Sequence, residues 1–411
     1  MKILIKNGRV IDPANGRDEI ADVLIGDRIL SVEKNIAEGA DKIINADSLW
    51  VTPGLIDIHT HLRDPGQLYK ESIASGCAAA AAGGFTAIAA MPNTVPAADN
   101  EEVIRYVISR SNKINLCRVI PVGSVTKGRL GRELTDIKKI INAGAAALSE
   151  DGSSVADAAL FFEALKVCAE LNIPMLSHCE DPSFKDSPDL AEELFAARDI
   201  ILAERAGARL HICHASAAGT VAILRNARSE KITAEAAPHH FVLSEDDFDG
   251  TDANYKMNPP LRSRRDVNEI IKALADGAIG VIASDHAPHH ASEKNVPYGR
   301  AANGVVGLET TVPLCVSCLV KKNILKPAQL IEKLTINPAR VLGLNAGTLS
   351  VGASADLTII DPDEKFYIDK NKFYSMGKNT PFHGRGVCGR VKQTIFGGRI
   401  VFSHDEGGIQ K

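Results

Sequence analysis

Histidine and aspartate residues stand at the ends of short apolar segments in the middle of the chain. In GLIDIHTHLRD, the alternation of an extended strand places Asp57, His59 and His61 on one face. Four later segments end in LSEDG, LSHCE, LHICHAS and VIASDHAPHH, which supply Asp151, His178, His214 and Asp285. Imidazoles and carboxylates are the ligands that Zn²⁺ and other divalent first-row ions prefer. The pattern predicts a metal site, the His–Asp cluster, made of His59, His61, Asp151, His178, His214 and Asp285.

The number of ions depends on a shared ligand. Two ions need a carboxylate between them, and Asp151 is the best-placed candidate. A single histidine at a strand end is usually a packed core residue. Six ligand-type residues that all stand at strand ends favour a metal site instead.

Other histidines of these segments are weaker candidates for metal ligands. By strand alternation His211 points away from the face of His214, so we expect it to pack or to support a ligand. His239 and His240 follow another strand in APHHFVLS, and either could support a ligand.

Two polar residues near the predicted site suit an anionic substrate. Arg63 follows His61 directly, and Asn93 ends the next strand in MPNT. Arginine binds a carboxylate through two parallel hydrogen bonds. Beside a metal cluster, Arg63 and Asn93 therefore indicate an anchor for a carboxylate. The paired prolines of KMNPPLR predict a loop that contains Asn258.

Short apolar runs alternate with amphipathic or alanine-rich stretches between about residues 55 and 342. We expect strands at 55–61, 85–91, 116–122, 145–149, 173–178, 209–214, 231–236 and 279–285. We expect helices at 70–82, 100–111, 133–143, 155–171, 190–207, 216–228 and 264–276, with an eighth at 308–321 or 327–342. Eight such units predict a (β/α)₈ barrel, whose reactive groups lie at the carboxyl ends of the strands. The alternative is an open doubly wound sheet, which is less favoured because no glycine-rich dinucleotide loop follows an early strand.

Both ends of the chain read as short β-strands separated by glycine-containing turns. We therefore expect a small β-sandwich domain made from residues 1–52 and 345–411, with the catalytic barrel at 53–344.

Composition excludes several classes of function. The 411 residues contain 47 Lys and Arg against 51 Asp and Glu, a net charge of −4. The chain therefore has no excess of basic residues to neutralise nucleic-acid phosphates. No stretch is long and apolar enough to span a membrane, and no secretory signal is visible at the start. The eight cysteines are scattered, which favours reduced thiols and a cytoplasmic location.

The motifs DIHTHLRDPG, MPNT, SEDG, HCED, HICHAS, APHH, YKMNPPLR, ASDHAPHH and NTPF occur in this order. In this combination the chain resembles the class I bacterial dihydroorotases of the amidohydrolase superfamily, over nearly its whole length. The paired histidines of HTH alone mark the superfamily, whereas KMNPPLR together with SDHAPH is more specific.

The resemblance implies a (β/α)₈ barrel with a small β domain and the same six metal ligands. Many superfamily members bridge two ions with a carbamylated lysine. Residues 145–155 contain no lysine, so Asp151 would bridge two Zn²⁺, of which one or two per chain are expected and two favoured. The implied substrate contacts are Arg63, Asn93, His289, Asn258 and Gly304.

The implied reaction is the reversible cyclisation of N-carbamoyl-L-aspartate to L-dihydroorotate in pyrimidine biosynthesis, with Asp285 as the catalytic acid and base. The implied assembly is a homodimer, with aspartate transcarbamoylase as a further candidate partner.

Two alternatives remain open. Hydantoinases, dihydropyrimidinases and allantoinases share the barrel and the chemistry, but their substrates need no carboxylate anchor. A silent homologue that only scaffolds aspartate transcarbamoylase would normally lose metal ligands, and all six are present here. The chain departs from the class in a shorter 178–214 segment and in Ala302-Asn303 before Gly304, where Pro-Phe is common.

Overall fold

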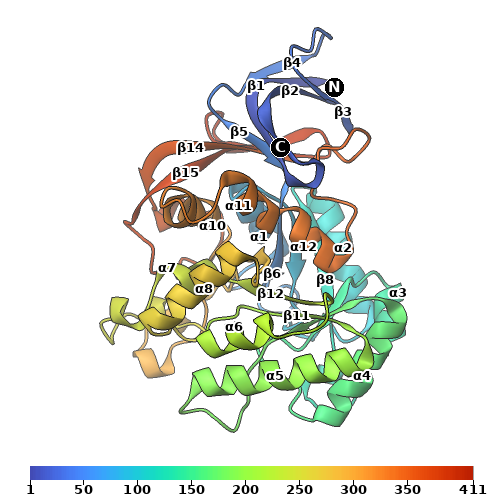
Figure 1. The fold of residues 1–411 in the computed structure, drawn as a ribbon, viewed down its shortest axis with the longest axis vertical. Coiled ribbons are helices and arrows are strands. Elements are labelled where there is room, and N and C mark those ends of the chain that lie inside the picture. The colour runs from blue at the N-terminus through green and yellow to red at the C-terminus, as the bar shows by residue number, and fades with distance from the viewer. Residues whose placement is uncertain (411) are drawn as a thin grey trace.

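The apolar segments in the middle of the chain form strands that pair in parallel, each with the next along the sequence. A computed structural model describes residues 1–410 (Figure 1). The eight strands are β6 (Leu55–Thr60), β7 (Phe85–Ala90), β8 (Arg118–Ser124), β9 (Ala147–Ser149), β10 (Pro174–Ser177), β11 (Arg209–Ile212), β12 (Ile232–Ala236) and β13 (Val281–Ile282).

The segment just beyond the last strand meets the first strand, so the barrel is nearly closed. The His61 N–H donates to the His286 carbonyl at 2.8 Å, and Thr60 forms a parallel bridge with His286. This nearly closed ring confirms the barrel and excludes the open doubly wound sheet.

Helices follow the strands and cover the outside of the barrel (Figure 1). They are α1 (Ile73–Ala82), α2 (Glu101–Ile114), α3 (Ile137–Asn142), α4 (Ala158–Leu171), α5 (Pro188–Ala206), α6 (Ala218–Arg225), α7 (Pro238–Val242), α8 (Arg264–Asp276), α9 (Ala291–Lys294), α10 (Thr311–Cys315), α11 (Pro327–Leu334) and α12 (Ile336–Leu342). Local sequence explains their limits. The Asn100 side chain accepts from two backbone N–H groups at the start of α2, and Gly277 ends α8 with a φ of 91°.

The stretch in which we expected one eighth helix contains several. Both 308–321 and 327–342 are partly helical, as α10 with a π-helical continuation at Val316–Val320, and as α11 with α12. Both stretches proposed for the eighth helix are therefore helical in part.

Both chain ends build a nine-stranded sheet at the other end of the molecule, shown in blue and red at the top of Figure 1. Its strands are β1 (Ile3–Asp12), β2 (Arg17–Ile25), β3 (Ile29–Glu33), β4 (Lys42–Asn45), β5 (Trp50–Pro53), β14 (Leu357–Tyr367), β15 (Gly386–Phe396), β16 (Arg399–Ser403) and β17 (Gly408–Ile409). The two ends join where β5 pairs in parallel with β1 and antiparallel with β14. The predicted β domain made from both termini is confirmed as part of the fold.

The exact division of the chain stays a proposal. We place it at 52/53 and 344/345, within one or two residues of the end of β5 at Pro53, the start of β6 at Leu55 and the end of α12 at Leu342. Within residues 1–410, no helix has the length and apolar character needed to cross a bilayer, and the eight cysteines form no disulfide.

Candidate metal centre

The His–Asp cluster assembles at the carboxyl ends of the barrel strands. His59 lies near the end of β6 and His61 just beyond it, while Asp151, His178, His214 and Asp285 follow β9, β10, β11 and β13. All six side chains are buried. The structure therefore brings together every residue that the sequence predicted for this cluster.

Asp151 lies at the centre of the cluster. Its Oδ1 is 3.3 Å from His59 Nε2 and 3.5 Å from both His178 Nδ1 and His214 Nε2. Its Oδ2 is 3.3 Å from His61 Nε2. Burial alone would raise the Asp151 pKa, but the surrounding imidazoles hold it well below its usual value. Asp151 is thus an ionised carboxylate that faces two pairs of histidines.

These distances divide the cluster into two groups that could each hold a cation and that share Asp151. His59, His61 and Asp151 form one, and Asp151, His178 and His214 form the other. Asp285 Oδ1 lies 3.3 Å from His61 Nε2 and 3.6 Å from His59 Nε2, beside the first group.

The donor atoms themselves fit a cation. His59 Nε2 and Asp151 Oδ1 are buried polar atoms without a hydrogen-bond partner, although nearly all such atoms in proteins have one. His178 Nδ1 and His214 Nε2 lie only 2.9 Å apart, so two lone pairs would repel unless a cation or a proton lay between them. Imidazole nitrogens with carboxylate oxygens form a donor set typical of Zn²⁺.

Other side chains fix which ring nitrogen each histidine turns toward the cluster. His59 Nδ1 lies 2.5 Å from Glu235 Oε1, and His178 Nε2 lies 2.9 Å from Glu180 Oε2. A carboxylate only accepts, so in the neutral rings these two nitrogens carry the hydrogen. The opposite nitrogens, His59 Nε2 and His178 Nδ1, keep their lone pairs for the cluster.

His61 is oriented in the same way by Asn93. Asn93 Oδ1 accepts from His61 Nδ1 at 2.9 Å, which leaves the Asn93 amide N–H groups free to donate elsewhere. The residue that the sequence predicted as a carboxylate anchor thus also supports a member of the cluster.

Three residues at this mouth have strained backbones. Arg63, His214 and Asp285 have φ values of 59°, 34° and 47°, in the left-handed region that side chains other than glycine rarely adopt. Such strain costs of order 1–3 kcal/mol per residue and gathers at functional sites. The fold therefore tolerates unfavourable backbone at positions where direction of the side chain matters.

Arg63 is buried beside the cluster and makes no ion pair within residues 1–410. Its Nε donates to the Pro288 carbonyl at 3.2 Å, and one terminal nitrogen lies 3.3 Å from His289 Nε2. Burial lowers the Arg63 pKa to about 10. A buried guanidinium without a carboxylate partner is unfavourable, so the free protein holds a cationic group suited to an anion.

The other predicted contacts lie around the same mouth. His289 Nε2 is 2.8 Å from the Asn303 carbonyl, and Asn258 Nδ2 donates to Glu180 Oε2 at 2.9 Å. Gly304 has a φ of 148°, and a Cβ there would lie 2.5 Å from the Ala287 carbonyl oxygen, so only glycine fits. The Gly304 N–H already donates to the Lys256 carbonyl at 2.9 Å.

Several residues around the cluster were not predicted from the sequence. Glu235 and Glu180 each bind a histidine of the cluster, and Asn379 Oδ1 accepts from the His289 N–H at 2.9 Å. Glu235 carried a detectable signal, because a glutamate within an otherwise apolar strand is rarely buried without a partner. His239 Nε2 lies 3.8 Å from Asp285 Oδ2, which agrees with a supporting role.

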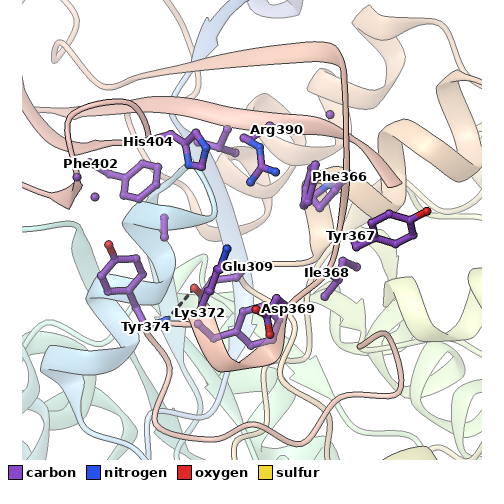
Figure 2. A pocket seen from close by; sticks show the side chains of 17 residues that line it. Glu309, Phe366, Tyr367, Ile368, Asp369, Lys372, Tyr374, Arg390, Phe402 and His404 are labelled. Atoms are coloured by element: carbon purple, nitrogen blue, oxygen red, sulfur yellow. Dashed lines mark hydrogen bonds between the residues drawn. The ribbon is translucent and has the colours of Figure 1, made fainter. Parts of the chain in front are cut away.

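A separate cavity of about 410 Å³ lies away from this mouth, between β14, β15, β16 and the loop around Tyr374 (Figure 2). Figure 2 shows Arg390 and His404 on one side of it and Glu309 on the other. Glu309 accepts from the Tyr374 N–H at 2.8 Å, and burial raises its pKa to about 7. None of the predicted site residues lines this cavity.

Comparisons with known proteins agree with this architecture. A sequence profile of the Amidohydrolase family matches residues 50–401. The chain is 44% identical to a dihydroorotase of Acetivibrio thermocellus, over 97% of this chain and 98% of that protein. It is 45% identical to a dihydroorotase of Pelotomaculum thermopropionicum, over 98% of both.

Among solved structures, the chain is similar to an L-hydantoinase (dihydropyrimidinase) from Arthrobacter aurescens. The TM-score is 0.91 at 25% identity, over 100% of this chain and 97% of that one. A dihydropyrimidinase from Brevibacillus agri matches with a TM-score of 0.87 at 24% identity, over 100% and 97% of the two chains, which bears on the fold alone.

Proposed function

The chain belongs to the amidohydrolase family, and we propose that it is a dihydroorotase, which interconverts N-carbamoyl-L-aspartate and L-dihydroorotate. One observation of the site carries the choice of substrate. Arg63 is a buried cation without an ion-pair partner in the described chain, and it lies at the mouth that contains the His–Asp cluster. A cyclic amide that bears a carboxylate satisfies this guanidinium, whereas a neutral hydantoin does not.

We assign the cations to the two groups that share Asp151. His59, His61 and Asp151 would hold one, and Asp151, His178 and His214 the other, with Asp285 beside the first. We favour two Zn²⁺ per chain, because no single ion can be shared by all four imidazoles in a tetrahedral shell that also contains both carboxylates. When bound, such ions acidify water and polarise a carbonyl oxygen.

The substrate carboxylate would bind between Arg63, Asn93 and His289. Asn93 Oδ1 is already occupied by His61, so its amide N–H groups remain free to donate to a substrate carboxylate. His289 lies within reach of Arg63, and burial lowers its pKa to about 4, so it is neutral at pH 7 and leaves the positive charge to Arg63. Asn258 and Gly304 would border the pyrimidine ring. These contacts fix the reacting amide relative to the cluster.

Asp285 is the proposed acid and base. Burial alone would raise its pKa, but the hydrogen bond from His61 and the charges of nearby histidines lower it, so the carboxylate is ionised at neutral pH. In the hydrolytic direction, a water oxygen forms a bond to the ring amide carbon and Asp285 accepts the proton. Asp285 then gives this proton to the ring nitrogen as the C–N bond breaks. The same steps in reverse close the ring.

The related hydantoinases define the alternative substrates, because the solved structures similar to this one include that class. A panel of L-dihydroorotate, hydantoin and dihydrouracil distinguishes them. We expect turnover of dihydroorotate with at least a tenfold preference in kcat/KM. Preferred turnover of either neutral ring would contradict the proposal, and no turnover of any substrate by the metal-loaded chain would favour the silent scaffold.

We further propose a homodimer in the cytoplasm, with aspartate transcarbamoylase as a candidate partner. The eight unpaired cysteines support a reducing compartment. Sedimentation of the chain alone, and then mixed with that enzyme, tests both associations.

A further inference from the structure

A chain of hydrogen bonds runs behind the His–Asp cluster through the inside of the barrel. Glu235 Oε1 lies 2.5 Å from His59 Nδ1, and Glu235 Oε2 lies 3.1 Å from His211 Nε2. The other His211 nitrogen, Nδ1, lies 2.8 Å from Thr233 Oγ1. His59, His211 and Glu235 are all at most 1% exposed. His211, which sequence alternation placed away from the cluster, is therefore connected to it through one carboxylate.

The strand pairing explains how these residues meet. β11 and β12 run in parallel with His211 opposite Thr233. Glu235 is two residues beyond Thr233 on the same strand, so both side chains lie on one face. That face turns toward β6, because Glu235 contacts His59 across the barrel. The arrangement depends on strand register, not on loops.

One assignment of hydrogens satisfies every member with neutral rings and an ionised Glu235. In this assignment the Thr233 hydroxyl donates to His211 Nδ1 at 2.8 Å in preference to the Leu210 carbonyl at 3.4 Å, and His211 Nε2–H donates to Glu235. His59 Nδ1–H donates to the other oxygen, which also accepts from the His214 backbone N–H at 3.3 Å. The series of hydrogen bonds then ends at His59 Nε2, a buried nitrogen that has no hydrogen-bond partner.

We propose that His211 is a positioning residue for the metal centre, which holds Glu235 and through it aims the His59 Nε2 lone pair at the cation. The inference rests on the proposed metal centre and does not depend on the identity of the substrate. Carboxylates that bind the far nitrogen of a metal-ligating histidine fix its ring and its tautomer, and their loss typically lowers metal affinity about 10- to 100-fold. Here the carboxylate itself needs a second anchor.

The need for that anchor follows from burial. Without His211, Glu235 Oε2 has no other hydrogen-bond donor in the structure, and a buried carboxylate oxygen without a donor is unfavourable. Glu235 would then be free to rotate, and rotation weakens its hold on His59. His211 thus acts two hydrogen bonds away from the cation.

The test is Zn²⁺ affinity, measured by competition with a chromogenic chelator. His211→Met removes the donor at similar volume, and His211→Gln keeps an N–H donor. We expect His211→Met to bind Zn²⁺ about 10- to 100-fold more weakly and His211→Gln to recover most of that loss. Substituted Co²⁺ supplies a second measurement, because its visible spectrum should change in His211→Met and not in His211→Gln.

Lys333→Met is the matched control. Lys333, on helix α11, is also buried and donates to the Ile279 carbonyl at 2.8 Å, but it makes no hydrogen bond to any of these residues. We expect its Zn²⁺ affinity to match wild type even if its Tm falls. If His211→Met does not fold, Thr233→Val is used in its place. Thr233→Val removes only the hydroxyl at the start of the series of hydrogen bonds and should weaken Zn²⁺ binding several-fold.

Wild-type Zn²⁺ affinity and an unchanged Co²⁺ spectrum in folded His211→Met, or in Thr233→Val when it stands in, overturn the proposal. Equal weakening in Lys333→Met also overturns it, because the effect would then be general to buried polar groups of the barrel. Wild-type protein that binds Zn²⁺ but does not turn over dihydroorotate contradicts the proposed function and leaves this inference intact.

Discussion

Replacement of Arg63 by methionine tests the proposed substrate. In the free protein, burial already makes the charged guanidinium of Arg63 unfavourable. Burial lowers the Arg63 pKa from 12.5 to about 10, which corresponds to a penalty of about 3 kcal/mol on the charged form. We infer that the substrate carboxylate offsets this penalty when it binds. Arg63→Met removes the cation, so the bound carboxylate would lose about the same free energy.

A loss of about 3 kcal/mol corresponds to roughly a 100-fold fall in kcat/KM. We expect most of it in KM, because Arg63 contacts the carboxylate in the ground state as well as in the transition state. Arg63→Lys keeps the charge without the paired donors and should fall between wild type and Arg63→Met. The free Arg63→Met protein should have an equal or higher Tm, since an uncompensated buried charge is gone.

Steady-state hydrolysis of L-dihydroorotate and of its neutral carboxamide separates binding of the carboxylate from general damage. Arg63→Met should lose activity on the acid and keep the wild-type rate on the carboxamide. Equal losses on both substrates, or a KM for dihydroorotate within threefold of wild type, would refute the anchor.

Two further substitutions probe other groups. Asp285→Asn should lower kcat by at least about 100-fold, because a positioned acid or base contributes about 10²- to 10⁴-fold to the rate. Its folding and Tm should stay near wild type. Steady-state turnover assays and thermal melts check both expectations, and a near-normal kcat would refute the role of Asp285. Glu309 has a pKa raised from 4.5 to about 7 by burial, so the folded chain holds this proton more tightly and the contribution of Glu309 to stability falls as pH rises from 4.5 to 7. The Tm difference between Glu309→Gln and wild type should therefore be more favourable to the variant at pH 8 than at pH 4.5, and a difference independent of pH would contradict the assignment.

Much of the fold could be predicted because each strand of the barrel is a short apolar run bounded by polar residues. Parallel strands place their carboxyl ends at one mouth, so the residues after each run converge without any knowledge of tertiary contacts. This is why Asp151 and His214, 63 positions apart in the printed numbering, could be assigned to one site before the structure was known.

The supporting residues were harder to predict, because they depend on contacts between strands that are not neighbours. Glu235 reaches His59 across the barrel, and no local pattern in TAEA specifies this partner. Strand alternation predicted that His211 faces away from His214, but it could not show that a carboxylate connects His211 to the cluster. The left-handed backbone at Arg63 and Asp285 likewise runs against the local preference of these residue types, so no local pattern predicts it.

Zinc content measured together with dihydroorotate hydrolysis tests the central claim most directly. We expect two Zn²⁺ per active chain, loss of turnover with a lower Tm after chelation, and return of both when Zn²⁺ is added. Full dihydroorotate turnover by a chain stripped of all metal would contradict this claim.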